Sequence, residues 1–470
     1  MRKQDSIPIV NIHEADTISA SSSVNHKIYI RAVKGVIERC RRYVGTLFIS
    51  LFLLIPWLTY KDQQAVLLDF VEQRFHLFNL SLWPQDLTIS AWLFIIAGFA
   101  LFFITVSFGR VWCGFMCPQT VFTFLFVWVE EFVEGSRHKR IHLDKQDAGI
   151  AKLSKKTSKH FLWLCIALVT SLTFVGYFTP IRELFNDFFT FNLSFWPLFY
   201  VVLFMFCTYA NAGWMREIMC THICPYARFQ STMFDKDTYT VTYDKVRGEG
   251  RGPRSKKLGQ TEYNDKGLGD CIDCNLCVQV CPTGIDIRHG LQYECINCGA
   301  FVDACNDVMS KMNYPVGLIS FTSESTLNAT PPSIIRPNVI AYFVVLIIMS
   351  GALVFDVFAR KTLDVGIIRD RNTLYNETFS GGILNVYNVI VRNKGQTIQR
   401  YKISLDGLPH GYIIGDTNIT VNASLQLRQA ITVAIDPKYL EQNVTDFNIV
   451  ISNQRGDVAK QKTNFIYTGL

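Results

Sequence analysis

The residues of this chain that are best suited to chemistry are its 14 cysteines, none of which lies after Cys305. Many of them occur in C-x2-C and C-x3-C pairs, a spacing that favours metal ligation over disulfide bonding. The densest group spans residues 271–282 and has the pattern C-x2-C-x2-C-x3-C-P, the cluster-binding run of bacterial ferredoxins. A zinc site more typically combines two C-x2-C pairs. We therefore expect this run to hold iron and sulfide.

A second half-motif follows in the same register and predicts a two-cluster arrangement. In two-cluster ferredoxins the fourth cysteine of one run ligates the other cluster. The first 4Fe–4S cluster is then expected to use Cys271, Cys274, Cys277 and Cys305. The second cluster is expected to use Cys281, Cys295 and Cys298.

The second cluster lacks one ligand, because Phe301 stands where a further cysteine is expected. A phenyl ring cannot bind iron. Three outcomes stay open: a three-iron (3Fe–4S) cluster, a cube completed by Asp303 or water, or no second cluster. We favour a labile or three-iron cluster. In the simplest alternative Phe301 only fills the core and one cluster suffices.

Two further cysteine pairs have the pattern C-x3-C-P and each follows an apolar stretch. Proline is favoured as the first residue of a helix, so Cys117 and Cys224 are expected at helix N-termini, where a thiolate is stabilised. Brought together, the four thiolates would suit a soft ion such as Cu(I), or a further cluster. The candidates for this copper or electron-exit site are Cys113, Cys117, Cys220 and Cys224.

The composition indicates a membrane protein, since 49% of the residues are hydrophobic and only 18% are charged. Soluble domains usually carry about 25% charged residues. Five apolar stretches approach the roughly 20 residues that span a bilayer as a helix. They are residues 43–60, 88–108, 161–179, 195–212 and 338–358. A shorter apolar segment, 120–133, runs into acidic residues and is expected to be interfacial or re-entrant.

Lysine and arginine counts predict the orientation of these spans. Segments 1–42, 109–160 and 213–337 carry eight, nine and thirteen basic residues, whereas loops 61–87 and 180–194 carry two and one. Basic segments stay in the cytoplasm, which also accounts for the net charge of +7 without nucleic acid. The cysteine-bearing segments are then cytoplasmic, in a reducing compartment, and the tail lies outside.

The tail is rich in short β-type runs separated by turn signals, as in an immunoglobulin-like sandwich. The expected fold is an α-helical membrane protein of about five transmembrane helices, with a cytoplasmic α+β domain of bacterial ferredoxin type and a C-terminal all-β immunoglobulin-like sandwich. The expected domains are a cytoplasmic tail (1–42), a four-helix membrane region (43–212), a cytoplasmic segment (213–337) with the ferredoxin-like part at about 260–315, a fifth membrane helix (338–358) and a periplasmic domain (359–470).

The order of these parts resembles the cytochrome c oxidase accessory proteins of the CcoG family, also called FixG or RdxA. Residues 109–119, 220–226, 271–288 and 290–295 carry the resemblance, which extends over nearly the whole chain. It implies a bacterial inner-membrane protein, needed for assembly of cbb3-type cytochrome oxidase, that reduces Cu(II) to Cu(I) before copper insertion. The family pattern has a cysteine at the position of Phe301.

The leading hypothesis is therefore a membrane-bound electron-transfer protein that acts as a cupric reductase. Its expected partners are the lipid bilayer, a cytoplasmic donor such as flavodoxin or ferredoxin, and cbb3 oxidase subunits or copper chaperones, with no nucleic acid. The oligomeric state is open, a homodimer included. Two alternatives remain: a quinol-linked electron conduit of the NapH type, and a non-enzymatic assembly scaffold with a redox-sensing cluster.

Overall fold

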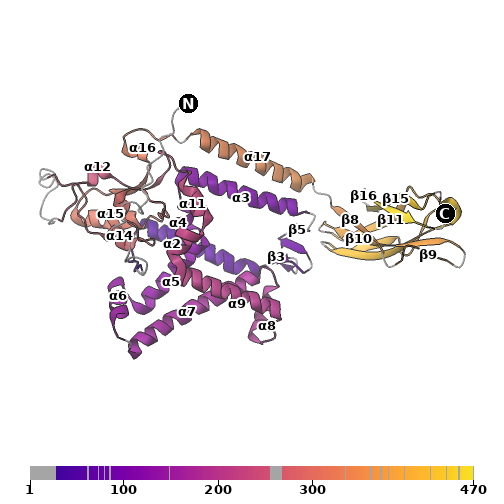
Figure 1. The fold of residues 1–470 in the computed structure, drawn as a ribbon, viewed down its shortest axis with the longest axis horizontal. Helices are drawn as coiled ribbons and strands as arrows, with labels where there is room; N and C mark the ends of the chain where they lie inside the picture. Colours follow the sequence, from indigo (N-terminus) through magenta and orange to yellow (C-terminus); the bar gives the residue numbers. More distant parts are fainter. Residues whose placement is uncertain are drawn as a thin grey trace. The chain divides into compact units, whose positions relative to one another are not determined.

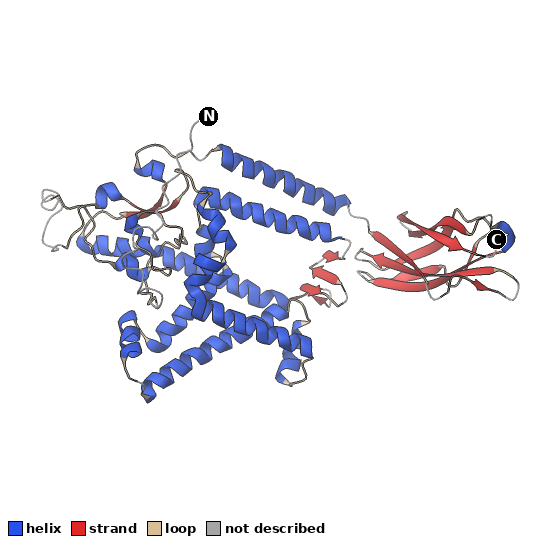
Figure 2. Cartoon of the chain, in the orientation of Figure 1, coloured by secondary structure: helices blue, strands red, loops and turns tan. Residues whose placement is uncertain are grey.

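A computed structural model describes residues 28–468, except for 61–62, 72, 79, 84–85, 148, 254–266, 334, 360–361, 371–372, 379–380, 396, 424, 441 and 454–455. Residues 1–27 of the expected tail and the start of the expected ferredoxin-like part lie outside the described residues. The chain divides into two compact units, one formed by 1–69 and 90–352 and the other by 70–89 and 353–470. Helices dominate the first unit and strands the second (Figures 1 and 2).

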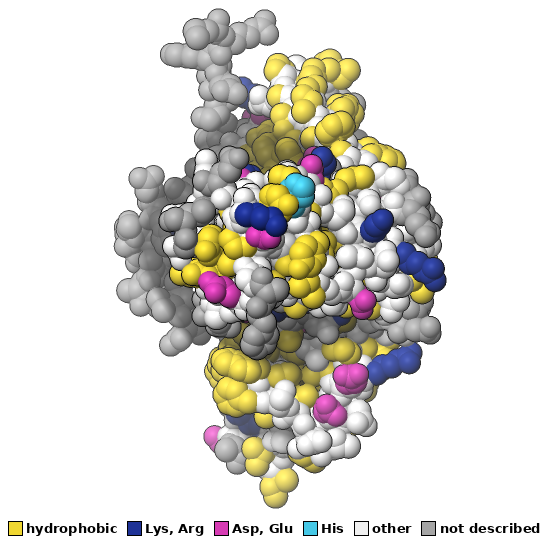
Figure 3. All heavy atoms as spheres, turned by 90° about the vertical axis from the view of Figure 1, so that its right-hand side faces the viewer, with side chains coloured by type: hydrophobic (Ala, Val, Ile, Leu, Met, Phe, Trp, Pro, Cys, Tyr) yellow, Lys and Arg dark blue, Asp and Glu magenta, His cyan; other side chains and the backbone are white. Residues whose placement is uncertain are grey.

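Among the described residues, six helical segments are long and apolar enough to cross a membrane, one more than expected. Five match the predicted spans and are built on α2 (Val36–Leu54), α3 (Leu87–Phe108), α7 (Ile150–Val175), α9 (Phe195–Tyr209) and α17 (Pro337–Ala359). Helix α7 begins before the predicted apolar stretch, because its first turns are rich in lysine, a good helix former. Hydrophobic side chains gather in broad areas of the molecular surface (Figure 3).

The sixth segment is Val111–Glu134, which includes the stretch that was expected to be interfacial or re-entrant. It is longer than the apolar stretch because α4 (Val111–Phe115) and α5 (Pro118–Glu134) follow one another with a single residue between them. By length and hydropathy, Val111–Glu134 is therefore able to cross a membrane. Its placement in a membrane stays a prediction.

Short elements connect the long helices of the first unit. They are η1 (Ile55–Trp57), α6 (Arg137–Lys145), α8 (Ile181–Phe189), α10 (Arg216–Ile218), α11 (Pro225–Ser231), α12 (Lys245–Gly248) and α16 (Glu324–Leu327), and the strands β1 (Thr59–Tyr60), β2 (Gln63–Gln64) and β3 (Val66–Asp69). Two π-helical turns, η3 (Ala210–Met215) and η4 (Met219–Ile223), follow α9, and α10 lies between them.

The cysteines at 271–305 lie in a small α+β part of the first unit, between β6 (Thr240–Tyr243) and β7 (Ile319–Thr322), which we call the cassette. Strands β6 and β7 pair antiparallel, and α14 (Leu276–Val280), η5 (Ile287–His289) and α15 (Ala300–Met312) enclose a common hydrophobic core. Asp273 and Asn297 adopt positive φ angles of 52° inside the two C-x2-C loops. Asp and Asn tolerate this left-handed backbone better than most residues, so each loop can turn its two cysteines inward.

The second unit contains two packed β-sheets, as expected for an immunoglobulin-like sandwich. One sheet has the order β12-β14-β10-β8 with β9 beside β10, and the other has the order β13-β11-β15-β16. The strands are β8 (Leu363–Arg369), β9 (Asn376–Glu377), β10 (Ile383–Asn393), β11 (Gln399–Asp406), β12 (Tyr412–Ile414), β13 (Asn418–Val421), β14 (Gln426–Ile435), β15 (Val444–Asn453) and β16 (Val458–Ile466), with the short helix η6 (Pro437–Tyr439). Inward-facing side chains of both sheets form one core.

A hairpin from early in the chain belongs to the second unit. Strands β4 (Arg74–Leu77) and β5 (Leu80–Leu82) pair antiparallel. Just after them, the Asp86 carboxylate forms a 2.7 Å ion pair with Lys394, and both side chains are 8% exposed. A buried pair of this kind fixes position because neither charge can be left alone there.

Candidate iron–sulfur and thiol sites

The four thiols expected for the first cluster lie together in the structure. The side chain of Cys305, on α15, faces those of Cys271, Cys274 and Cys277. All four line one small cavity of about 30 Å³ between the C-x2-C loop, α14 and α15. The rest of its wall is mostly apolar, with Arg288 at the side. This donor set, four soft sulfur atoms around an enclosed space, fits a 4Fe–4S cube.

Burial governs the protonation of these thiols. It raises the pKa of Cys277 to about 11, although the positive charge of Arg288 acts in the opposite direction. It raises the pKa of Cys305 to about 12. Without iron these thiols would therefore be protonated at neutral pH. Cluster assembly must displace the protons, because the thiolate is the form that binds metal.

The three thiols expected for the second cluster form a separate group. Cys295 neighbours Cys298 and Cys281, and each of the three side chains is at most 5% exposed. Burial raises the pKa of Cys295 to about 12 and that of Cys281 to about 11. The group thus contains three closely placed thiols in a dry setting, which suits a cluster with one ligand other than cysteine.

Two residues near this group bear on the missing ligand. Phe301 is 3% exposed and packs into the cassette core. The Asp303 carboxylate accepts hydrogen bonds from the backbone N–H groups of Glu38 and Ile37, at 2.7 and 3.3 Å. It therefore caps the N-terminus of α2, where a carboxylate is stabilised by the helix dipole. Asp303 could serve as a substitute ligand only if these bonds broke.

The structure also brings the two C-x3-C-P pairs together. Cys113 neighbours Cys117, Cys220 and Cys224. Pro118 and Pro225 are the first residues of α5 and α11, as predicted, so Cys117 and Cys224 sit directly before a helix. Among the described residues, no three His, Cys, Asp or Glu side chains converge closely enough to hold a single metal ion. A cluster holds its thiolates farther apart than one ion does, because iron and sulfide lie between them.

The backbone at Gly114, between Cys113 and Cys117, contacts the second-cluster loop, residues 295–298. The thiols of Cys113, Cys117, Cys220 and Cys224 are called the membrane-edge thiols below, because each pair follows an apolar stretch. A Cβ atom placed on Gly114 would lie 2.7 Å from the Ile296 carbonyl oxygen and 2.8 Å from the Cα atom of Cys298. Only glycine fits such an approach. Gly114 follows Cys113 directly, so the two thiol groups are separated by a single layer of backbone. Sequence reasoning missed this contact, although a glycine inside a C-x3-C motif is a signal of close approach.

Arg110 lies between the same two groups and was also missed. It is 2% exposed and donates hydrogen bonds to the carbonyl oxygens of Tyr293 and Ala227. Its charge acts on the sulfur atoms of both Cys113 and Cys295. A buried guanidinium between two thiol groups favours negative charge on either. Arg110 therefore couples the groups electrostatically as well as through its hydrogen bonds.

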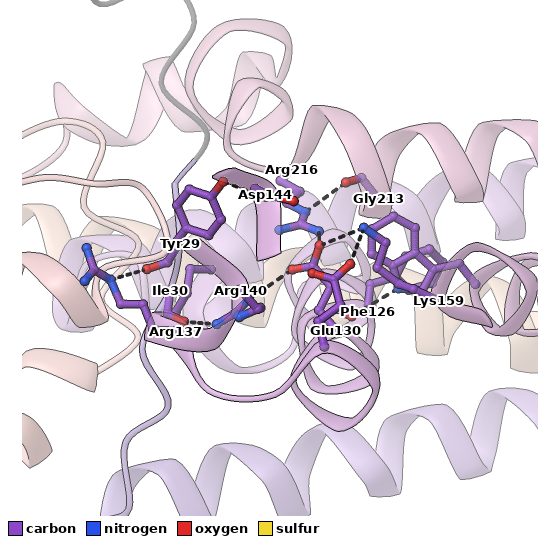
Figure 4. Close-up of polar contacts among 12 residues, drawn as sticks. Tyr29, Ile30, Phe126, Glu130, Arg137, Arg140, Asp144, Lys159, Gly213 and Arg216 are labelled. Carbon is purple, nitrogen blue, oxygen red and sulfur yellow. Dashed lines mark hydrogen bonds and ion pairs between the residues drawn. The ribbon is translucent and has the colours of Figure 1, made fainter. Parts of the chain in front are cut away.

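A cluster of buried charges holds the helices that carry these thiols (Figure 4). Glu130 of α5 is paired with Arg216 at 2.8 Å, Arg140 at 3.2 Å and Lys159 at 3.7 Å. Arg216 has a positive φ of 32°, between the two π-helical turns that precede Cys224. Such π-turns are frequent at functional sites. The ion pair holds this unusual backbone in place, four residues before Cys220.

Three family models match the chain. Residues 215–324 match a "4Fe-4S dicluster domain", residues 90–139 match a "4Fe-4S binding domain", and residues 353–468 match an "IG-like fold at C-terminal of FixG". The first match covers the cassette, and the second includes Cys113 and Cys117. The chain is therefore an iron–sulfur protein that carries 4Fe–4S clusters.

Curated relatives match most of the chain. The nitrogen fixation protein FixG of Rhizobium meliloti is 31% identical over 96% of this chain and 92% of its own length. The proteins RdxA and RdxB of Cereibacter sphaeroides are 35% and 37% identical, over 81% and 80% of this chain and 82% and 81% of their own. With its apolar helices, cysteine cassette and β-sandwich tail, the chain belongs to the FixG/RdxA family of membrane iron–sulfur proteins.

Proposed function

We propose that this chain is a membrane electron-transfer protein that reduces Cu(II) to Cu(I) at the membrane-edge thiols, for copper insertion into cbb3-type oxidase. The single observation that carries the proposal is the contact between Gly114 and the backbone of Cys298. It places a group of four soft donors beside the cassette. Such a site is suited to receive an electron from the cassette and to hold the Cu(I) that forms.

The clusters, when bound, supply one-electron carriers. The protein residues provide the rest of the chemistry. As they stand, the thiols of Cys113, Cys117, Cys220 and Cys224 do not converge closely enough for three of them to hold one ion, so they would have to move together to bind copper. Their thiolates would then favour Cu(I) over Cu(II), because sulfur is a soft ligand. Burial disfavours the Cys113 thiolate, and the positive charge of Arg110 acts in the opposite direction. Each Cu(II) takes up one electron, and each thiol that ligates the copper releases its proton on binding.

The orientation forms part of the proposal. The basic segments 1–42, 109–160 and 213–337 support a cytoplasmic location for all three thiol groups, in a bacterial inner membrane, with the β-sandwich in the periplasm. The proposed partners are a cytoplasmic donor of flavodoxin or ferredoxin type and, for copper delivery, oxidase subunits or copper chaperones.

The orientation can be tested by labelling the β-sandwich from outside. A cysteine introduced at exposed Asp416 should react with an impermeant maleimide in intact cells.

Copper reduction can be tested with purified protein whose clusters have been reduced beforehand. Cu(II) is added and Cu(I) is followed with a chelator specific for that state. A variant with serine at Cys113, Cys117, Cys220 and Cys224 should reduce copper at least about tenfold more slowly, a 1.4 kcal/mol effect. Its iron and sulfide content should stay unchanged.

The matched control replaces Cys165 and Cys207 with serine. These two partly buried thiols lie on α7 and α9, and their loss should leave the rate unchanged. If the four-serine variant forms Cu(I) as fast as the parent, the thiols are not the copper site. If the parent forms no Cu(I) at all, the proposed reductase activity is wrong.

A further inference from the structure

We propose that the hydroxyl group of Tyr243 donates a hydrogen bond to the sulfur atom of Cys271 when the first cluster is bound, and so raises the reduction potential of that cluster. Tyr243 lies outside the expected set of cluster ligands. The inference goes beyond copper reduction, because it concerns the first cluster alone and can be measured without copper.

Strand β6 directs the Tyr243 side chain into the core of the cassette. Successive side chains of a strand point to opposite faces. Val241 and Tyr243 are 0% and 3% exposed and belong to the cassette core, whereas Thr242 between them is partly exposed. Tyr243 pairs with Ile319 of β7, which fixes its register. Its side chain thereby lines the same small cavity as the four thiols of the first cluster.

The hydroxyl group of Tyr243 is a buried donor that lacks a hydrogen-bond partner among the described residues. The Cys271 thiol is its neighbour in the cavity wall. A protonated thiol is a weak hydrogen-bond partner, and a buried donor left unpaired is costly. Iron binding converts the thiol into a thiolate, which is a better acceptor. The donor set of the first cluster therefore supplies the acceptor that this hydroxyl group needs.

The surroundings of the phenol hold it in this position. A Cβ atom placed on Gly248 would collide with the Tyr243 hydroxyl oxygen and with the ring carbon that carries it. The backbone of α12 thus packs directly against the hydroxyl group, an approach that only glycine permits. The Arg251 guanidinium lies 5.8 Å from the centre of the ring. The ring therefore has little room to turn its hydroxyl group away from Cys271.

The hydroxyl group acts as a fixed dipole and exchanges no proton. A phenol has a pKa of about 10 in water, and burial raises the pKa of Tyr243 further, so the group is protonated at neutral pH. Reduction transfers one electron from the cytoplasmic donor to the cluster, and no bond of the tyrosine forms or breaks. Hydrogen bonds to cluster sulfur atoms stabilise the added negative charge. The O–H group of Tyr243 therefore favours the reduced state.

A redox titration of the full-length protein, followed by EPR, tests the proposal. Tyr243→Phe removes one oxygen atom and keeps the ring that fills the core. The equilibrium constant for reduction of the first cluster should fall about fivefold, or about 40 mV for a one-electron couple. The matched control is Tyr314→Phe, because Tyr314 is 7% exposed in the same core but does not line the cavity. Its potential should equal that of the parent.

Deuterium exchange separates a hydrogen bond from a change in packing. In protein equilibrated with D₂O and then reduced, ENDOR spectroscopy should detect a deuteron coupled to the first cluster that is missing in Tyr243→Phe and present in Tyr314→Phe. An unchanged or higher potential in Tyr243→Phe, or the same deuteron couplings as in the parent, would overturn the proposal. Loss of iron and sulfide from Tyr243→Phe alone would also overturn it, in favour of a purely structural role. No copper is added, so these outcomes are independent of the copper assay.

Discussion

Arg288 places a buried positive charge beside the thiols of the first cluster. Its side chain is 8% exposed and pairs with Asp286 and Asp273 at 2.6 and 2.5 Å. It lines the same cavity as Cys277. A reduced cluster carries one more negative charge than an oxidised one, so this guanidinium stabilises the reduced state. The residue therefore helps to set the reduction potential.

Replacing Arg288 with glutamine should lower the potential of the first cluster. We expect a fall of about 60 mV, which corresponds to a tenfold change for a one-electron couple. The measurement is a redox titration followed by EPR. Lys311→Gln removes a charge from the surface of α15, where the side chain is 63% exposed, and should shift the potential far less. An unchanged or higher potential in Arg288→Gln would refute the electrostatic role.

At the residue scale, the ferredoxin pattern indicated which cassette cysteines lie near one another, and the structure places them so. Their role as cluster ligands stays a prediction. Short C-x2-C and C-x3-C spacings bring neighbouring cysteines together, but the meeting of the two C-x3-C-P pairs depends on the fold. Spacing said nothing about Arg110 or Gly114, whose importance depends on contacts with loops more than 100 residues away. It also left the role of Asp303 open, since only the fold shows that its carboxylate caps α2.

Helix α5 is held by charges that its length and hydropathy do not reveal. Glu130 and Glu134 are at most 2% exposed, and they face basic residues of α6, α7 and α10. Charged groups in an apolar setting are tolerated only when they are paired. The pairs fix α5 against the helix that leads to Cys220. The arrangement of the membrane-edge thiols thus depends on this cluster.

Neutralising the centre of this cluster should destabilise the helical unit. In Glu130→Gln three basic side chains lose their shared partner, and breaking a buried pair typically costs about 3–5 kcal/mol. Thermal unfolding of the solubilised protein, followed by circular dichroism, should show a clearly lower midpoint. The neighbouring Glu131→Gln serves as control, because Glu131 lies outside this charge cluster and is partly exposed. Equal midpoints in the two variants would contradict the account.

At the element scale, hydropathy predicted five long helices but underestimated the length of the helical segment that ends at Glu134. Apolar windows ignore α4 and the polar first residues of α5, although these are helical in the structure. The β-type runs expected in the tail are residues 383–392, 398–405, 427–435, 447–452 and 462–467, and they overlap the longer strands β10, β11, β14, β15 and β16. Strands β8, β12 and β13 were not predicted, because they are short or contain glycine and give a weak alternating pattern.

At the scale of the whole molecule, the candidate functional thiols and the β-sandwich belong to different units. All thiols lie in the helical unit, and the second unit has none. Composition predicted this division, but it did not predict that residues 70–89 join the sandwich. The buried pair of Asp86 and Lys394 joins positions 308 residues apart, a separation that no local pattern can anticipate. The family match fits the same division, with separate models for the cassette and the tail.

The proposed electron transfer requires iron–sulfur clusters on the cassette. The most direct measurement is low-temperature EPR, combined with iron and acid-labile sulfide analysis, on anaerobically purified full-length protein. The account predicts a coloured protein with labile sulfide, and it predicts that the signal of the reduced first cluster is lost when Cys271 is replaced with serine. A colourless protein that contains zinc and no labile sulfide would contradict it.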